Sequence, residues 1–480
     1  MTYAIALIFG SLYGFMFGII PVAGAATGLI TIYGFMDYFR ADPYLLVIFT
    51  TAVVVSSTIG DSFASVVMNI PGANGSAATM VDGFPMARRG EGARALSAAL
   101  VTSTVNGAIW GGLVFFFLPY YGSLIMGFGI PEMWAFTMLS MACITFLNGK
   151  YWFRSLCGLA IGVFLGLVGS DPVSNAERFT GGWFYLAAGI QIMPVMAGFL
   201  AVPELIEALF SKVETIRINN REIYRQMWQG AVDSWHMKWD GLRGGAIGGV
   251  VGLLPGIGGN IADWLAYGQT VAINKKEEFG KGNVRGVIGC EGANNAQKAT
   301  AYVPTVLFGV PAAPFEAVVM ALFMYVGLEM GSPALLTDMT FFNVLTSSYM
   351  GSLVIAFILS VVFIRYAVNI MRMPFKYYFW PLLAVIVWSC AQYTGGWEDY
   401  AVFTLCAVLG LVFKYLKISR ASVVIGFVLA DRVEMLSRQF FSLYEFSDLL
   451  GRPISVTLLT VAVAAAIYGI LFNKSKVEYQ

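Results

Sequence analysis

Residues 244–258 read GGAIGGVVGLLPGIG, an apolar stretch with a glycine at every fourth position and a proline before its last three residues. A counterpart begins 234 residues earlier, where residues 10–24 read GSLYGFMFGIIPVAG. Four glycines and one proline keep the same spacing in the two stretches. This repetition predicts two related membrane repeats, 1–210 and 241–480, joined by an amphipathic polar linker, 211–240.

The composition is that of a membrane protein. Of 480 residues, 58% are hydrophobic and 12% are charged, whereas soluble chains carry about 25% charged residues. Apolar runs of about 20 residues, enough to cross a lipid bilayer as helices, recur along the chain. We therefore expect an all-α polytopic membrane protein. Lys and Arg occupy short loops and form no single basic face, so nucleic acid is not an expected partner.

The chain has few residues suited to covalent chemistry. Its five cysteines are scattered without metal or disulfide spacing, and His236 is the single histidine. No nucleotide-binding P-loop is found. These features argue against catalytic residues, a resident metal or cofactor, and an enzyme acting on lipids. They favour transport of a small molecule.

The charges of the loops support inverted repeats. Because cytoplasmic loops carry excess Lys and Arg, equivalent loops of inverted repeats should differ in charge. Five basic loops have counterparts in the other half with at most one Lys or Arg. The basic loops are 86–94, 149–154, 275–285, 365–376 and 414–420, and their counterparts are 329–339, 392–399, 37–42, 119–132 and 170–182. We expect the basic loops and the linker on the cytoplasmic side and the N-terminus on the other side.

The two Gly-rich stretches combine a packing signal with a helix break. Glycines at every fourth position form a flat strip on one helix face, which is typical of close helix packing. Proline interrupts a helix, and neighbouring glycines permit other backbone conformations. Backbone groups freed there can coordinate an ion, so the ion-coupling candidates include Pro255, Gly256, Gly258 and Asn260. A simple kink or a turn between two short helices is the alternative.

Two further motifs, Asn69-Ile70-Pro71-Gly72 and Gly309-Val310-Pro311, interrupt long apolar runs and indicate re-entrant hairpins. Neutral polar residues that suit a carboxylate or a sodium ion surround both motifs. The predicted substrate-binding residues are Ser62, Ser65, Asn69, Pro71, Gly72, Asn74, Asn294, Asn295, Thr305, Gly309 and Pro311. Hydrogen bonds between helices, worth about 0.6 kcal/mol each, are the competing explanation.

Asp61 and Asp263 each lie in an apolar segment without other charges. An ionisable side chain inside the membrane is costly and is by default a functional candidate. Each acid could bind a coupling cation, carry a proton or contact a cationic substrate, and a helix-capping acid at the membrane edge is the alternative. Glu291 and Glu316 are weaker candidates of the same type.

These motifs resemble the large membrane subunit of tripartite tricarboxylate transporters, the TctA family. That family has a Gly-rich stretch ending in Leu-Pro-Gly-x-Gly, an Asn-Ile-Pro-Gly tip, and a following Asp-Gly-Tyr-Pro-Met-Ala-Arg-Lys-Gly. This chain has LPGIG at 254–258 and DGFPMARRG at 82–90. It also has EGANNA at 291–296, GVP at 309–311 and RPIS at 452–455. The resemblance covers nearly the whole chain.

The resemblance implies a permease that takes up di- or tricarboxylates by symport with a cation, Na+ or H+. It implies an inverted-repeat fold with broken helices that moves as an elevator, in the bacterial inner membrane. The implied partners are a small membrane subunit of four helices and a periplasmic solute-binding protein. A second copy of the chain, in a homo-oligomer, is a further candidate partner. A carrier or channel for another solute class, such as amino acids or sugars, is the alternative function.

Three departures from the family pattern lie close to the expected site. Residues 21–24 read PVAG where the family has Pro-Gly-x-Gly, and residues 60–62 read GDS in place of Gly-Gly-Ser. Asp263 replaces a serine. Two of these changes add an acid, so we hypothesise altered cation coupling or a less negative substrate.

Overall fold

The fold is described from a computed structural model of the chain. It describes residues 2–20, 24–70, 76–125, 128–146, 151–171, 174–210, 222–255, 259–370, 376–390 and 396–471. In these ranges the regular structure is helical apart from two strands of two residues each, which confirms the expected all-α class. Six of the described helices are long and apolar enough to cross a membrane, so the chain is a multi-pass membrane protein.

The part of the chain up to Phe210 forms long helices separated by short ones. The helices are α1 (Thr2–Ile19), α2 (Gly24–Ile32), η1 (Tyr33–Phe35), α3 (Asp37–Arg40), α4 (Pro43–Met68), α5 (Thr79–Arg88), α6 (Gly92–Ile125), α7 (Ile130–Phe146), α8 (Trp152–Gly166), α9 (Phe184–Ala187), α10 (Ile192–Met196), η4 (Ala197–Ala201) and α11 (Val202–Phe210). The strands β1 (Gly169–Ser170) and β2 (Glu177–Arg178) pair antiparallel.

The part of the chain from Ile223 onward is entirely helical where it has regular structure. The helices are α12 (Ile223–His236), α13 (Lys238–Gly252), α14 (Gly259–Ile273), α15 (Val284–Phe308), α16 (Pro314–Tyr325), α17 (Pro333–Leu336), α18 (Met339–Ile370), α19 (Lys376–Cys390), α20 (Trp397–Tyr415), α21 (Arg420–Leu443), α22 (Phe446–Leu450) and α23 (Pro453–Leu471).

The two glycine strips pack two pairs of helices backbone to backbone. On α1, Cβ atoms added at Gly10, Gly14 and Gly18 would lie 2.9, 2.5 and 2.3 Å from carbonyl oxygens of α4. On α13, Cβ atoms added at Gly244 and Gly248 would lie 2.1 and 2.4 Å from carbonyl oxygens of α15. Only glycine permits so close an approach, and the expectation of close packing is confirmed.

The carbonyl groups that face the two glycine strips lie at equivalent positions of α4 and α15. On α4 they belong to Phe49, Val53 and Ser57, and on α15 to Gly289, Ala293 and Gln297, each 240 residues later. The helix ends keep the same separation. Asn69 and Gly309, which follow α4 and α15, both have left-handed backbone conformations with φ values of 54° and 61°. The predicted breaks at these two motifs are therefore present in the backbone.

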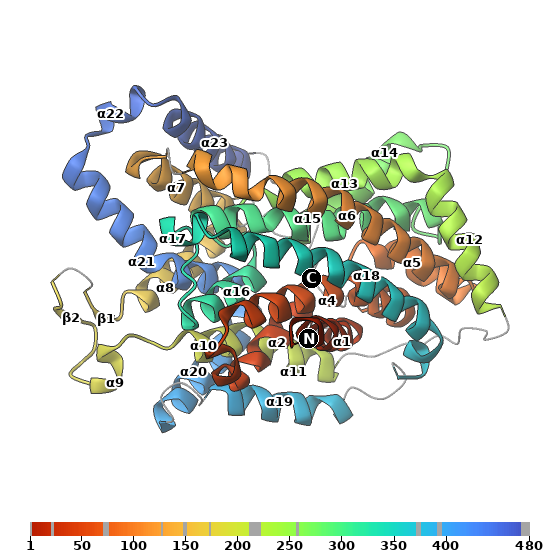
Figure 1. The fold of residues 1–480 in the computed structure, drawn as a ribbon, viewed down its shortest axis with the longest axis horizontal. Coiled ribbons are helices and arrows are strands. Elements are labelled where there is room, and N and C mark those ends of the chain that lie inside the picture. The colour runs from red at the N-terminus through yellow and green to blue at the C-terminus, as the bar shows by residue number, and fades with distance from the viewer. Residues whose placement is uncertain are drawn as a thin grey trace.

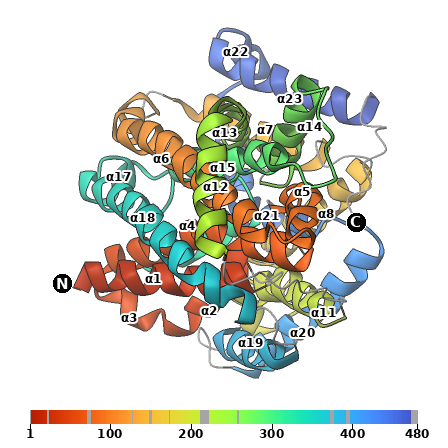
Figure 2. The same ribbon diagram turned by 90° about the vertical axis from the view of Figure 1, so that its right-hand side faces the viewer.

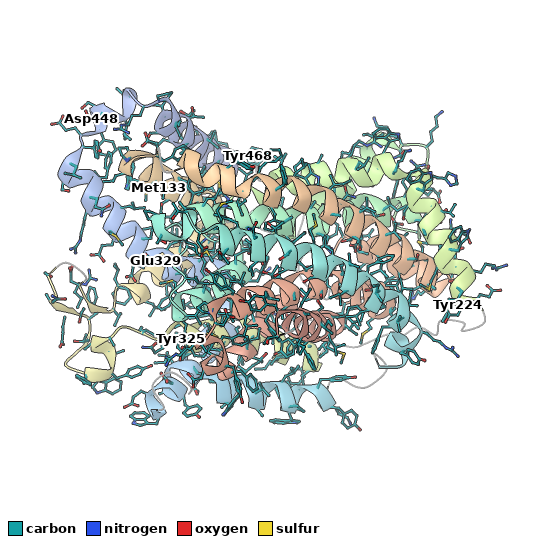
Figure 3. All side chains as sticks on the ribbon, viewed as in Figure 1. Met133, Tyr224, Tyr325, Glu329, Asp448 and Tyr468 are labelled. Atoms are coloured by element: carbon teal, nitrogen blue, oxygen red, sulfur yellow. The ribbon has the colours of Figure 1, made fainter. Side chains whose placement is uncertain are left out.

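Three of the segments expected on the cytoplasmic side, 86–94, 275–285 and the linker, contact one another. Arg89 donates a hydrogen bond to the Lys281 carbonyl, and Arg94 pairs with Asp233. At the opposite ends of the helices, Tyr44 donates to Asp338. In Figure 1, α12 lies at one end of α6 and α18, and α17 lies at the other end. Figure 3 places Tyr224 far from Glu329.

Helix α12 is amphipathic, as expected for the linker. Its inner face packs on α6, where Ser97 donates to the Met227 carbonyl and Gly230 lies against the Arg94 carbonyl. Its outer face exposes aromatic side chains, including Trp228 and Trp235. Figure 2, seen from this side, shows α12 lying across the ends of other helices. Aromatic residues on such a helix are typical of a membrane–water interface.

Candidate functional site

The candidate site lies where α4 and α15 meet, because Glu291 and Asn294 of α15 form hydrogen bonds with residues of α4. Glu291, Asn294 and Lys298 are three and four positions apart, so they share one stripe of the helix. All three are buried. Figure 2 shows α15 between α13 and the helices of the first half.

The carboxylate of Glu291 is the best-satisfied group of the site. Its Oε1 atom accepts hydrogen bonds from Ser62 Oγ at 2.8 Å and from Thr79 Oγ1 at 2.6 Å. Its Oε2 atom accepts from Asn294 Nδ2 at 3.3 Å. Hydrogen bonds to an ionised acceptor are stronger than neutral ones. Glu291 therefore ties α4, α5 and α15 together.

Asp61 and Asp263 have carboxylate oxygens without partners near the hydrogen bonds of Glu291. Asp61 Oδ1 accepts from Asn294 Nδ2 at 3.3 Å, whereas its Oδ2 atom has no partner among the described residues. Both carboxylate oxygens of Asp263 likewise lack a partner in the described part of the chain. The two aspartates and Glu291 interact electrostatically, so α4, α14 and α15 bring three acids together.

Lys298 is the buried cation of the site. Its side chain is 7% exposed, and its Nζ atom lies 4.2 Å from the ring centroid of Phe315. Its charge acts on Asp61 and Asp263. A buried ammonium without an anion is costly, so its place among acids is expected.

Several predicted substrate-binding residues are used by structural hydrogen bonds or lie elsewhere. Ser65 donates to Ser76, and Asn295 turns toward α6 and donates to Ser103 at 3.0 Å. Thr305 donates to the Ala301 carbonyl one turn earlier in its own helix. Asn69 is exposed, unlike Ser62. The structure therefore brings Asp61, Ser62, Asn294 and Asp263 together, turns Asn295 toward α6, and leaves Thr305 about three turns further along α15.

The second tip contacts a side chain that the sequence reasoning missed. A Cβ added at Gly309 would lie 2.9 Å from the Arg432 guanidinium, and one at Gly331 would lie 2.8 Å from it. Both glycines have positive φ values. Gly309 and Pro311 are buried in this arrangement. Arg432 on α21 thus lies against the tip, where the two glycines leave it room, and donates a hydrogen bond to the Met330 carbonyl.

Some predicted residues fall outside the described residues. They are Pro71, Gly72 and Asn74 of the first tip, Gly256 and Gly258 of the Gly-rich break, and the side chain of Asn260. Pro255 is described and is buried just beyond α13. The roles assigned to these residues stay predictions.

Thr79 and Lys298 were also not selected from the sequence, although the isolated charge of Lys298 in an apolar segment marks it as a candidate. Lys298 is the single Lys or Arg between Gly286 and Val310, so the argument that selected Asp61 applies equally to it. Thr79 gave no signal, because its position depends on the connection between α4 and α5. Contacts made by such connections cannot be read from periodicity.

The arrangement suits binding of a cation more than covalent chemistry. Free carboxylate oxygens of Asp61 and Asp263 can attract a monovalent cation, and nearby hydroxyl groups can complete its ligands. In the described part of the chain, no three His, Cys, Asp or Glu side chains form a metal-binding group. Four of the five cysteines are buried and Cys157 is half-buried, as expected for packing residues.

Comparisons with known proteins agree with the sequence motifs. A family model described as "Tripartite tricarboxylate transporter TctA family" matches residues 4–425. A protein of Agrobacterium vitis, described as an uncharacterized 52.8 kDa protein in the TAR-I ttuC' 3'region, is 27% identical over 472 residues, covering 97% of this chain and 92% of its own. A second A. vitis protein, from the TAR-II ttuC' 3'region, is 27% identical over 229 residues, covering 47% of this chain and 94% of its own. No solved structure matches.

Proposed function

Because this chain belongs to the tripartite tricarboxylate transporter TctA family, we propose that it takes up an organic carboxylate together with a monovalent cation. It acts as the large permease subunit beside a small membrane subunit of four helices. A periplasmic solute-binding protein delivers the di- or tricarboxylate, and the permease lies in the bacterial inner membrane. Na+ or H+ is the coupling ion.

The observation that carries this proposal is the pair of buried aspartates with free oxygens. Asp61 and Asp263 come from α4 and α14, which belong to different halves of the chain, and both are at most 2% exposed. A charged group inside a membrane protein persists where it has a function or a partner. A cation bound by both would offset part of their negative charge and join the two halves, which is what coupling requires.

The substrate site of this proposal lies next to the ion site. Ser62 donates a hydrogen bond to Glu291, and Asn294 donates one to Asp61. The tips at Asn69 and Gly309 follow α4 and α15, the helices that carry these residues. The repeated register of α4 and α15 supports inverted repeats. In this proposal the repeats carry the site across the membrane as an elevator.

The experiment that tests the proposal is uptake by the complete three-component system in proteoliposomes. Asp61→Asn and Asp263→Asn are each compared with wild type across sodium and proton gradients. We expect each variant to lose most of its dependence on the coupling gradient, because one cation ligand has lost its charge. Glu278→Gln, which removes an exposed acid next to Lys281, is the control and should transport normally. Unchanged coupling in both aspartate variants would overturn the proposal.

A further inference from the structure

Lys298 has more acids around it than it can pair with, and it contacts none of them directly. Its charge acts on Asp61, Asp263 and Glu316. Among the described residues, Phe315 is its recorded partner, and no carboxylate oxygen lies within ion-pair distance of Nζ. The ammonium is therefore shared between acids.

The three acids belong to two groups on different helices. Asp61 and Asp263 belong to the ion site on α4 and α14. Glu316 is 1% exposed, and neither of its oxygens has a hydrogen-bond partner in the described part of the chain. It lies in the first turn of α16, next to Phe315 and just after the tip at Gly309–Pro311. Each group offers the ammonium free acceptor oxygens.

The cost of buried charge decides which acids stabilise the ammonium. An ammonium in an apolar surrounding needs an anion, and a buried acid without a cation is equally costly. An external cation at Asp61 and Asp263 would repel Lys298, since like charges at short range interact strongly where water is scarce. Glu316 follows Phe315, whose ring the ammonium already contacts, and it is the other acid on which the charge of Lys298 acts.

We infer that Lys298 is a tethered cation that alternates between the Asp61–Asp263 pair and Glu316, and that it competes with the monovalent coupling cation for the two aspartates. This inference rests on the proposed function. Binding of the external cation drives Lys298 to Glu316 and changes the charge at the start of α16. The ion site is thereby coupled to the tip at Gly309–Pro311, where we place the substrate.

The first test is sodium binding to the purified protein, measured with radioactive sodium and by sodium-dependent thermal stabilisation at one fixed pH. We expect Lys298→Met to lower the sodium concentration for half-saturation at least tenfold, because the competing charge is gone. Lys298→Arg keeps the charge and should remain close to wild type. Lys281→Met, which removes an exposed ammonium, is the matched control and should change nothing.

The second test asks whether Glu316 acts through Lys298. Glu316→Gln should raise the sodium concentration for half-saturation, because Lys298 is left with the aspartates alone. In the double variant with Lys298→Met, the substitution at Glu316 should have almost no effect. Equal effects of Glu316→Gln in the presence and absence of Lys298 would show a direct action through space and would overturn the alternation.

The outcomes separate this inference from the proposed function. If wild type binds sodium but Lys298→Met binds it no more tightly, the tethered cation is ruled out and cation coupling stands. If wild type binds neither sodium nor lithium, sodium coupling is ruled out, and so is the competition between Lys298 and sodium. If Lys298→Met does not fold, Glu316→Gln must still weaken sodium binding for the inference to stand.

Discussion

Helices α4 and α15 have the same packing and different chemistry. Each lies under a glycine strip, in the same register, and each ends in a left-handed residue. At the positions where α15 has Glu291, Asn294 and Lys298, α4 has Thr51, Val54 and Thr58, 240 residues earlier. The shared backbone pattern therefore places the two helices alike. The charged side chains differ between the helices and, in the proposed function, select what is bound where the helices meet.

The largest expected effect tests the scaffold. Gly14→Ala and Gly248→Ala would each place a Cβ within 2.5 Å of a backbone carbonyl oxygen, at Val53 and Ala293. Because backbone cannot swing aside, each change should lower the free energy of unfolding by about 3 kcal/mol, the upper end for overpacking. Thermal unfolding in detergent measures this effect.

A control for these glycines is available on α14. A Cβ at Gly268 meets nothing within 4 Å, so Gly268→Ala should leave stability unchanged or slightly raised. A large loss at Gly14 without one at Gly248 would show that the two packings are not equivalent.

A smaller effect is expected from the difference in chemistry. Glu291→Gln weakens the hydrogen bonds from Ser62 and Thr79, and we expect a loss of about 2 kcal/mol, typical of bonds to a charged group. Thr51→Val, at the matching position of α4, should leave stability unchanged or slightly raised, because the Thr51 hydroxyl is buried without a hydrogen-bond partner among the described residues. The same unfolding measurement compares them. A neutral result for Glu291→Gln would mean that its carboxyl group is protonated in the folded protein.

The smallest effect is expected at the first tip, at Asn69. At the second tip, Gly309→Ala forces a side chain into the left-handed region, which costs about 1–2 kcal/mol, and places a Cβ 2.7 Å from the Met330 carbonyl oxygen, which adds to that cost. Asn69→Gly should be close to neutral, since glycine adopts that conformation freely. Chemical denaturation of both variants measures the difference. A large loss for Asn69→Gly would show that the asparagine side chain itself supports the first tip.

The sequence predicted the features that depend on backbone pattern. The glycine strips and the breaks at Asn69 and Gly309 follow from residue type and spacing, and the structure confirms them. Asp61 and Asp263 were selected because an acid at membrane depth is rare. Adjacent residues of a helix point about 100° apart, so Asn294 and Asn295 could not both face the site. Which one does so depends on how α6 and α4 pack around α15.

Other parts of the site required the folded chain. Thr79 of α5 and Ser62 of α4 both donate to Glu291, and no local sequence pattern predicts that these two residues meet there. Arg432 reaches Gly309 across a separation of more than 100 residues. Such contacts result from tertiary packing, which a single sequence does not display.

The unequal burial of the long helices has a consequence for the bilayer. Of the 18 most apolar consecutive residues in each helix, 78% are buried in α4 and 17% are buried in α23. Helices that touch lipid respond to a change in hydrocarbon thickness by tilting, at a cost of fractions of a kcal/mol per Å of mismatch. Thinner or thicker membranes should therefore tilt α23 first, while the crossing of α4 and α15 keeps its geometry.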